Sequence, residues 1–404
     1  MHHRTAPPAE RLRIIVLGYI VRGPIGGMWW SDAHYLLGLR TLGHDVYFVE
    51  DSDDYPSCFD PVRNVTDTDP RYGLAFAQRT LARVGLGDCW AYHDAHTAQW
   101  HGPAAAQMAA RCATADLVLN LGGVNPLRPW LQAVPCRVLV DKDPVFMQIR
   151  HLTDPGARAR ALQHTAFFSF GENWGRADCT MPDDGLPWQP TRHPIILDRW
   201  PVIPAPAAGK FTTVMQWDSY AAREYNGRRY GMKSDSFGPY LDLPARAGRR
   251  FELAVGDHRA PRDVLAHHGW DVVDPMHPPW DPWTYQRYVQ AARAEFSIAK
   301  HGYVAAATGW FSERSAAYLA SGRPVLTQET GCSAWLRTGA GVLTFSTPDA
   351  ALAGVEDIDR RYAFHCAAAR DVAAAYFDAR TVLSHLIETA LGHPARRATP
   401  AAGP

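Results

Sequence analysis

The sequence predicts an α/β protein built from two Rossmann-like domains that face each other across a cleft. Short apolar runs recur in both halves of the chain, and most of them end in a polar or glycine-rich loop. A proline- and alanine-rich stretch at residues 201–209 separates the halves and is predicted to be a linker. The length of 404 residues exceeds what one hydrophobic core usually supports, so two domains are expected.

Composition narrows the class of protein. The chain has 41 basic and 41 acidic residues, and this balance argues against a nucleic-acid polymer as the partner. No apolar run approaches the roughly 20 residues that cross a bilayer, and the first ten residues lack the apolar core of a secretory signal. The seven cysteines contain no CxxC pair and indicate reduced thiols, without a zinc site or a disulfide framework. We therefore expect a cytoplasmic protein that does not bind membranes.

The first half of the chain, residues 11–200, is predicted to form the N-terminal domain. Its strands are expected at residues 13–18, 45–49, 116–121, 137–140 and 166–170. After the first strand we expect a loop containing glycines 23, 26 and 27, and then a helix over residues 31–42. These glycines do not form GxGxxG, which argues against a dinucleotide site although Glu50 ends the second strand. Parallel strands bring their terminal loops to one rim, where ligands bind.

Aspartate pairs of the form Asp-x-Asp occur four times, at residues 51–53, 67–69, 141–143 and 357–359. Paired carboxylates can hold Mg²⁺ or Mn²⁺ on a diphosphate, but acidic residues in loops are more often simply solvated. Asp141 and Asp143 alone come directly after a strong strand. We therefore single out these two as a general base or as ligands of a substrate hydroxyl.

The second half of the chain, residues 210–375, is predicted to form the C-terminal domain. Its strands are expected at residues 210–215, 251–255, 270–273, 295–299, 324–327 and 342–345. Apolar residues at helical spacing predict a helix over residues 359–377, and a last helix is expected within residues 376–391. Residues 392–404 are predicted to be a disordered tail.

The stretch from Lys300 to residue 327 carries the clearest indication of a ligand. A predicted strand ends at Lys300, a loop with His301 and Gly302 follows, and Ser312 is placed to cap a helix that ends near residue 322. The free NH groups at such a helix start, together with Lys300 and Arg314, suit a diphosphate.

This stretch resembles the nucleotide-binding signature of GT-B glycosyltransferases of the group 1 and CgeB-like bacterial families. The matching residues are Phe-Ser-Glu-Arg-Ser at 311–315 and Ala-Ser-Gly-Arg-Pro-Val-Leu at 320–326. The resemblance implies a nucleotide sugar held by the second domain, an acceptor held by the first, and terminal helices that return toward the first domain. It also implies that cationic side chains replace a bound metal and that no other cofactor is used.

One departure from the family affects the expected stereochemistry. Retaining group 1 enzymes carry two glutamates eight residues apart, and the corresponding positions here are Gly309 and Ala317. Glu313 is the acid that remains, and it is a candidate ligand for a ribose hydroxyl. We therefore expect inversion at the transferred carbon.

The resemblance and the chemistry of the side chains together predict roles for the remaining candidates. Lys300, Arg314 and the helix start at Ser312 are predicted to stabilise the leaving diphosphate, with Lys233 in reserve. Asp143, Asp32 and His34 are the candidate bases. Loop residues expected to border the two substrates are Gly26, Gly27, Asp141, Gln216, Trp217, Met276, His301 and Gly302.

The predicted function is transfer of a hexose from a nucleotide sugar such as UDP-glucose to a hydroxyl of a small molecule, for example a nucleoside or another natural product. The alternatives are a sugar-nucleotide epimerase of the same fold, which would turn over its substrate without an acceptor, and a non-catalytic protein that binds nucleotide sugars. A glycogen-phosphorylase-like enzyme is disfavoured by the chain length, and a NAD-dependent oxidoreductase by the glycine pattern.

Overall fold

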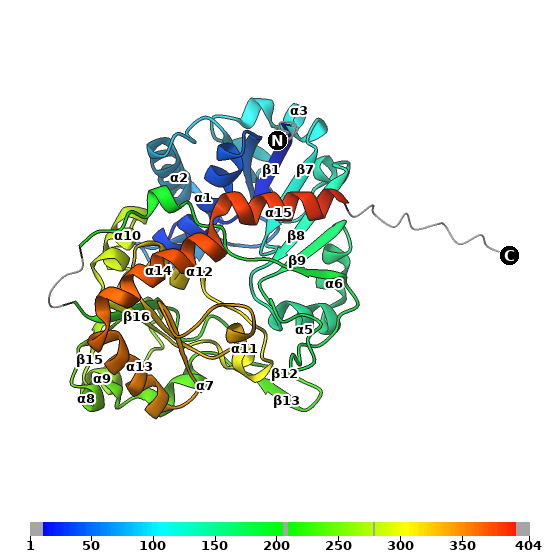
Figure 1. Cartoon of the computed structure of the whole chain (residues 1–404). Coiled ribbons are helices and arrows are strands. Elements are labelled where there is room, and N and C mark those ends of the chain that lie inside the picture. The colour runs from blue at the N-terminus through cyan, green and yellow to red at the C-terminus, as the bar shows by residue number, and fades with distance from the viewer. Residues whose placement is uncertain (1–10, 205–208, 278, 393–404) are drawn as a thin grey trace, which may run out of the picture.

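A computed structural model describes residues 11–204, 209–277 and 279–392, and it contains two parallel sheets (Figure 1). The first sheet has eight strands in the order β10-β9-β8-β7-β1-β2-β5-β6, of which β6 alone runs antiparallel to its neighbour. The second sheet has six parallel strands in the order β15-β14-β11-β16-β17-β18. The predicted pair of doubly wound sheets is confirmed.

The strands of the first sheet are β1 (Arg13–Leu17), β2 (Asp45–Asp51), β5 (Trp90–Asp94), β6 (Gln99–His101), β7 (Leu117–Leu121), β8 (Cys136–Asp141), β9 (Ala166–Ser169) and β10 (Trp188–Pro190). Those of the second are β11 (Phe211–Met215), β14 (Phe251–Val255), β15 (Trp270–Val273), β16 (Ala294–Ser297), β17 (Val325–Gln328) and β18 (Val342–Phe345). Two hairpins pair β3 (Cys58–Asp60) with β4 (Val65–Asp67), and β12 (Arg223–Tyr225) with β13 (Arg228–Tyr230).

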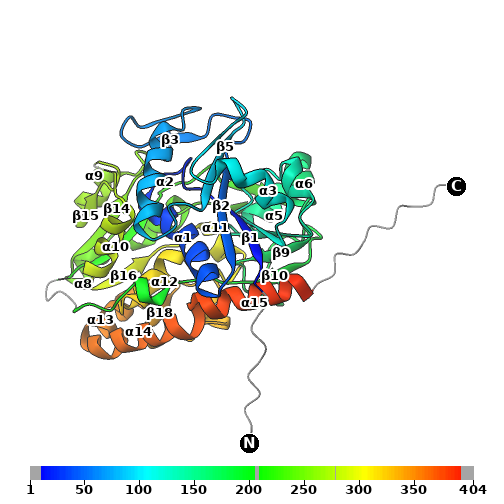
Figure 2. The same ribbon diagram turned by 90° about the horizontal axis from the view of Figure 1, so that it is seen from above.

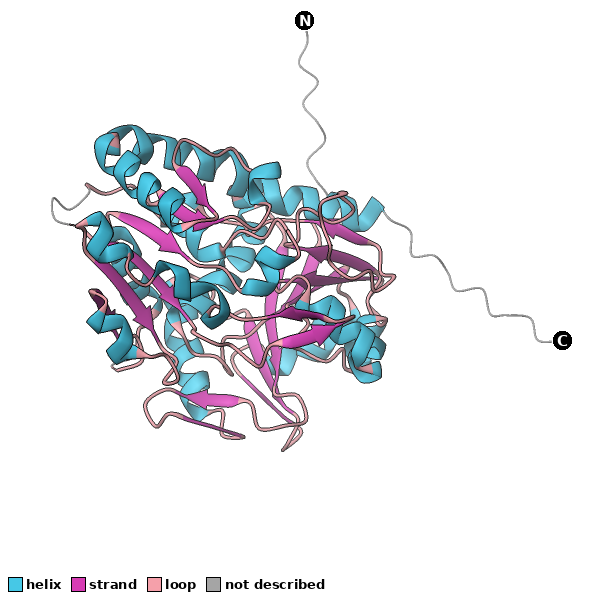
Figure 3. Cartoon of the chain, turned by 90° about the horizontal axis from the view of Figure 1, so that it is seen from below, coloured by secondary structure: helices cyan, strands magenta, loops and turns pink. Residues whose placement is uncertain are grey.

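Helices lie between and beside the strands of both domains (Figure 3). In the first domain they are α1 (Gly26–Thr41), α2 (Arg71–Arg83), α3 (Met108–Ala113), α4 (Pro129–Gln132), α5 (Phe146–Thr153) and α6 (Pro155–Ala161). In the second they are α7 (Ser234–Phe237), α8 (Leu243–Ala247), α9 (Arg262–His267), α10 (Pro282–Ala291), α11 (His301–Ala305), α12 (Glu313–Ala320) and α13 (Pro348–Arg360). The chain ends with α14 (Tyr362–Phe377) and α15 (Ala379–Gly392).

The last two helices carry the chain back to the first domain, as predicted (Figure 2). Helix α14 packs on α12 of the second domain, and α15 packs on α1 and β8 of the first. Ile195 fixes the crossing, because its N–H donates to the carbonyl of Phe377 (2.7 Å) and its carbonyl accepts from the N–H of Ala379 (3.0 Å).

The first helix differs from its predicted limits, since α1 begins at Gly26 and not at residue 31. Gly26 and Gly27 therefore form its first turn, and they pack against the second domain. A Cβ atom at Gly26 would lie 2.5 Å from the carbonyl oxygen of Asp281, and one at Gly27 would lie 3.1 Å from the ring of Tyr285. The glycines permit a close approach of the two domains and do not line the cavity described below, so this placement does not support the prediction that they border the acceptor.

A continuous hydrophobic cluster crosses from one domain to the other. It includes Trp29 and Trp30 of α1, Tyr285 of α10, and Leu383 of α15, all of them buried. The indole N–H of Trp30 also donates to the carbonyl of Pro282 (2.7 Å). The interface is thus packed like an interior, which holds the rims of the two sheets in a fixed relation.

Parts of the predicted linker and tail lie outside the described residues, namely 205–208 and 393–404. Gly392, which the prediction places in the tail, is the last residue of α15. Among the residues that the structure describes, no helix is both long and apolar enough to span a bilayer.

Leu383 offers a test of how much the returning helix stabilises the fold. Its side chain is fully buried against α1, where a Cβ atom at Gly38 would lie 2.5 Å from it. We expect Leu383→Ala to lower the free energy of unfolding by about 2–5 kcal/mol, since it leaves a cavity. Leu391 lies on the same helix and is 47% exposed, so Leu391→Ala is the control and should change stability by less than about 0.5 kcal/mol. Equal denaturant midpoints for the two variants would contradict the docking of α15.

Candidate active site

A cavity of about 570 Å³ lies between the domains, within the range of volumes typical of small-molecule sites. Its polar lining includes Asp32, Lys142 and Asp143 from the first domain, and Tyr220, Arg223 and Glu313 from the second. Two successive glycines after β7, Gly122 and Gly123, also border it and have φ values of 71° and 62°. Glycine adopts this left-handed conformation without the steric penalty that other residues meet, which lets the chain turn along the cavity wall.

The carboxylate of Asp143 connects the two domains across this cavity. Its Oδ1 accepts from Lys300 Nζ (2.8 Å) and from the hydroxyl of Tyr303, and its Oδ2 accepts from the hydroxyl of Tyr220. Lys300 Nζ also lies 3.0 Å from the Tyr220 hydroxyl. The side chain of Asp143 remains 30% exposed, so a ligand can reach it. Neither tyrosine was assigned a role from the sequence, because only the fold brings both to Asp143.

Asp141 lies two residues before Asp143 and fixes the turn that carries it. It is fully buried, and it accepts from the N–H of Asp143 (2.8 Å), Ser169 Oγ (2.7 Å) and Gln148 Nε2 (3.0 Å). Burial raises the pKa of Asp141 to about 6. Since its oxygens accept from protein donors and it does not line the cavity, the expectation that Asp141 contacts the substrate is wrong. It shapes the turn that presents Asp143.

The same turn contains backbone strain. Val145 has φ 70° and ψ −44°, a region that β-branched residues very rarely adopt. The conformation is held because its N–H donates to Gln148 Oε1 (2.6 Å) and its side chain is buried. Strain of this kind is commonly found where a loop positions functional groups.

Lysines are rare in this chain but frequent at the junction of the domains, and one of them, Lys142, lines the cavity. The sequence contains four lysines, and three of them, Lys142, Lys233 and Lys300, lie at the junction of the domains. Lys142 pairs with Asp32 (3.0 Å), whereas the ammonium group of Lys233 has no hydrogen-bond or ion-pair partner among the described residues. Burial, together with the nearby charges of Arg314 and Lys300, lowers the pKa of Lys233 to about 7.

Helix α12 begins beside these cations, as the sequence predicts. Ser312 is its N-cap, and its Oγ accepts the N–H of Arg314 (3.2 Å). Glu313, in the first turn, lines the cavity, and its Oε2 lies 3.7 Å from Nε2 of the buried His193. Burial opposes ionisation of Glu313, but His193 and Lys142 outweigh it and lower its pKa. Glu313 is therefore an ionised carboxylate facing the cavity.

Arg314 does not face the cavity and serves the fold instead. Its guanidinium donates to the carboxylate of Glu295, to Ser297 Oγ (2.7 Å) and to the carbonyl of Val214 (2.8 Å). Arg314 thereby ties α12 to β16 and β11 beneath the site. The expectation that it binds a phosphate directly is not supported by this placement.

Two of the candidate bases, Asp32 and His34, lie in different surroundings. Asp32 lines the cavity, and it accepts from the N–H of Tyr19 (2.7 Å) and from Lys142. His34 is buried away from the cavity, with its ring nitrogens 3.1 Å from the N–H of Ile196 and 3.1 Å from the indole N–H of Trp200. Burial lowers the pKa of His34 to about 3. Its enclosure rules out the predicted contact with an acceptor.

His301 and Gly302 serve the packing of α11. Nδ1 of His301 accepts the N–H of Gly231 (3.2 Å). A Cβ atom at Gly302 would lie 2.6 Å from the ring of Phe146, so this glycine allows the two domains to touch.

The other predicted loop residues lie at the rim of the second sheet. Met276 and Gln216 flank Gly256, at 3.2 and 3.6 Å from the position of a Cβ there, whereas Trp217 is buried against Phe237. Gln216 is exposed at this rim, and neither it, Trp217 nor Met276 lines the cavity. Their contact with a nucleotide stays a prediction.

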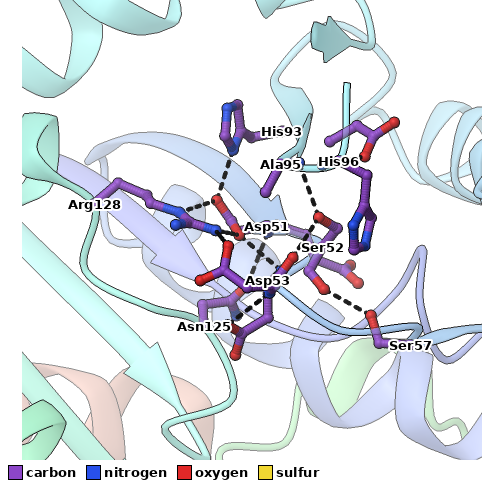
Figure 4. A network of polar contacts seen from close by, with 12 residues as sticks. Asp51, Ser52, Asp53, Ser57, His93, Ala95, His96, Asn125 and Arg128 are labelled. Carbon is purple, nitrogen blue, oxygen red and sulfur yellow. Dashed lines mark hydrogen bonds and ion pairs between the residues drawn. The ribbon is translucent and has the colours of Figure 1, made fainter. Parts of the chain in front are cut away.

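The carboxylates of the first Asp-x-Asp sequence belong to a polar network of the first domain (Figure 4), of which Asn125 lines the cavity. Asp51 accepts from Arg128 (2.9 and 3.0 Å) and lies 2.7 Å from Nδ1 of His93. Asp53 accepts two hydrogen bonds from Arg160 (2.7 and 3.1 Å), which itself lines the cavity. These carboxylates are neutralised within the protein.

Comparison with known proteins identifies the fold. No family model and no curated protein matches the chain. Solved structures do match, among them an α-glucosyltransferase in complex with UDP-glucose and DNA containing an abasic site, at a TM-score of 0.58 and 10% identity over 94% of this chain and 98% of that one. Anabaena HepE in complex with UDP and glucose matches at 0.56 and 10% identity, over 95% and 100% of the two chains. AviGT4, a glycosyltransferase involved in avilamycin A biosynthesis, matches at 0.50 and 14%, over 94% and 97%.

These similarities extend over nearly the whole chain, and they show that it has the GT-B fold of glycosyltransferases. The narrower resemblance to CgeB-like enzymes stays a prediction.

The pKa of Lys233 can be measured directly, because reductive ¹³C-methylation labels only four lysines and the chain terminus. We expect one methyl signal, absent from Lys233→Arg, to titrate near pH 7. Lys210 is the internal control, because Glu252 and Asp271 raise its pKa by more than burial lowers it. If the chemical shift of the Lys233 methyl signal shows that the amine stays protonated up to pH 10, the placement of this side chain is contradicted.

The role given to Arg314 predicts a loss of stability. Arg314→Ala leaves the carboxylate of Glu295 buried without its cation, so the free energy of unfolding should fall by about 3–5 kcal/mol. Chemical denaturation measures this, with Arg287→Ala on the exposed face of α10 as the unaffected control. Wild-type stability combined with weakened nucleotide binding would instead assign Arg314 to the ligand.

Proposed function

We propose that this protein is a glycosyltransferase that moves a hexose from a UDP-sugar to a hydroxyl group of a small molecule. The observation that carries the proposal is that Lys300 and Lys233 lie close to each other and to the start of α12, beside a cavity between the domains. Lys300 donates to Asp143 and Glu313 begins α12, and both of these carboxylates line the cavity. Support comes from the GT-B fold, since two of the similar structures contain UDP-glucose or UDP and glucose.

The donor diphosphate is proposed to bind at the start of α12, next to Lys300 and Lys233. Unsatisfied N–H groups and the helix dipole favour an anion there. As the bond between sugar and phosphate breaks, negative charge grows on the departing UDP, and the two ammonium groups stabilise it. In this proposal they do the work that a metal ion performs in other transferases. Glu313 lines the cavity itself, so we assign it to a hydroxyl of the transferred sugar, in place of the predicted ribose contact.

Asp143 is the proposed base. It is more exposed than Asp32, whose side chain is only 3% exposed and which stays paired with Lys142. When Lys300 turns to the diphosphate, Asp143 loses one of its donors and becomes available to an acceptor hydroxyl. It takes the hydroxyl proton, the oxygen bonds to the anomeric carbon, and the bond from that carbon to the phosphate oxygen breaks. A single displacement of this kind inverts the configuration.

A small acceptor fits the cavity better than a polymer. The volume of about 570 Å³ must hold the sugar and the acceptor together, and the balanced charge of the chain provides little attraction for a nucleic acid. Some similar structures contain DNA, so duplex DNA belongs among the acceptors tested. We further propose that the reaction takes place in the cytoplasm.

Lys300→Ala tests the donor site. We expect the affinity for UDP to fall roughly 10- to 100-fold, as for loss of a charged hydrogen bond, with a similar fall in kcat/KM for UDP-glucose. Lys210→Ala is the matched control, because Lys210 pairs with Glu252 and Asp271 at the opposite end of the strands. Calorimetry measures UDP binding, and release of UDP measures turnover, each with and without EDTA.

Three outcomes would count against the proposal. Unchanged UDP affinity in Lys300→Ala would remove the diphosphate assignment, and loss of activity in EDTA would remove the metal-independent mechanism. Conversion of the UDP-sugar to an epimer without an acceptor would favour the epimerase alternative.

A further inference from the structure

Arg223 stands apart from the other cations that line the cavity. Lys142 pairs with Asp32, and Arg160 forms two hydrogen bonds with Asp53. Arg223 forms no ion pair with any described residue, and its Nε is buried without a hydrogen-bond partner among them. A buried donor without a partner costs about 1–3 kcal/mol, so an unpaired guanidinium at a cavity wall indicates a place for an anion.

Arg223 lies on β12, in the β12–β13 hairpin of the second domain, at the junction of the two domains. Strand β12 packs against α5 of the first domain, and β13 packs against α11 of the second. The donor cation Lys233 instead lies close to Lys300 and Arg314, at the end of the second sheet. Arg223 therefore borders the part of the cavity that is formed by the first domain.

The cavity wall on this side is largely apolar. It is formed by side chains from β7, β8, α5, α6 and the loop after β7, namely Leu121, Leu127, Leu139, Met147, Ala157 and Ala161. Arg150 and Arg160 add further cationic groups from α5 and α6. The acids that line the cavity, Asp32, Asp143 and Glu313, come from other elements: α1, the turn after β8, and α12.

The polar groups near Asp32 suit the sugar. Ser31 lines the cavity, is 7% exposed, and its Oγ has no partner among the described residues. Together with Asp32 and Glu313 it provides donors and acceptors for sugar hydroxyls. The apolar wall is then left for the body of the acceptor.

We infer that the acceptor is a hydroxylated molecule with an apolar, ring-sized body and an anionic group, a carboxylate or a phosphate, that binds Arg223. A guanidinium presents parallel N–H donors that match either anion in a bidentate way. The apolar side chains supply the contact area for the ring, and the acceptor hydroxyl reaches Asp143. This inference rests on the proposed function, because it assigns the acceptor half of the same site.

Matched aromatic probes test the inference in the presence of saturating UDP. The probes are 4-hydroxybenzoate, 4-hydroxyphenyl phosphate and the neutral methyl 4-hydroxybenzoate, with binding followed by ligand-observed NMR and calorimetry. We expect one or both anions to bind the wild-type protein roughly 10- to 100-fold more tightly than the ester, as a charge-assisted hydrogen bond predicts. The comparison of the two anions tells a carboxylate site from a phosphate site.

Arg223→Gln should abolish the preference for the anions while the ester still binds. Arg229→Gln is the control, since Arg229 lies on the paired strand β13, forms its ion pair with Asp235 and does not line the cavity. Thermal melting of each variant confirms that it is folded.

Three other results would overturn either the acceptor inference or the proposed function. If the wild-type protein binds UDP but neither anion better than the ester, or no probe at all, the acceptor inference is wrong and the donor site stands. If Arg223→Gln weakens UDP binding and keeps the preference for anions, Arg223 belongs to the donor. If UDP itself does not bind the wild-type protein, the proposed function fails first.

Discussion

The carboxylate of Asp143 is the contact on which the arrangement of the site depends. It belongs to the first domain, yet its donors Lys300, Tyr303 and Tyr220 all belong to the second. Its position is set by the buried Asp141 beneath it and by the strained turn at Val145. Because the contact that joins the domains lies inside the cavity, a ligand that draws Lys300 away changes the acceptor side at the same moment. In the proposed mechanism, binding of the donor and release of the Asp143 carboxylate from Lys300 therefore occur together.

Lysine and arginine are used differently in this chain. Arginine side chains such as Arg22, Arg314 and Arg323 are buried, and their planar groups tie strands and loops together through several hydrogen bonds each. Three of the four lysines lie at the junction of the domains. A guanidinium held in a fixed fork suits permanent contacts, whereas a compact ammonium on a flexible stem can exchange one partner for another. Arg223 differs from these arginines, because its guanidinium forms no ion pair or hydrogen bond with any described residue.

The sequence predicts the fold well and the site only in part, for identifiable reasons. The strands that are compact apolar runs were predictable, and so was the start of α12, because Ser312 has the chemistry of an N-cap. Strands β5, β6 and β10 of the first sheet are not among the predicted ones, since they mix aromatic and polar residues and form no apolar run. Arg314 was misplaced because its partner, Glu295, lies 19 residues earlier, although an acid inside an apolar strand was a visible clue. The contacts of Tyr220 and His34 join residues 77 and 166 positions apart, and no local pattern contains such information. The spacing of residues in the sequence predicts where helices and strands lie. The chemistry of a site depends in addition on which distant helices, strands and loops come together in the fold.

The return of α15 to the first domain has a consequence for the way the protein is made. The groove on α1 that receives Leu383 is formed by residues near Gly38, but the helix that fills it is among the last described parts of the chain. At about 5–20 residues per second, synthesis from the end of the first domain to the end of α15 takes on the order of 10–40 s. During that interval the first domain presents an uncovered apolar strip to the cell. The first domain therefore completes its packing only after α15 has been synthesised.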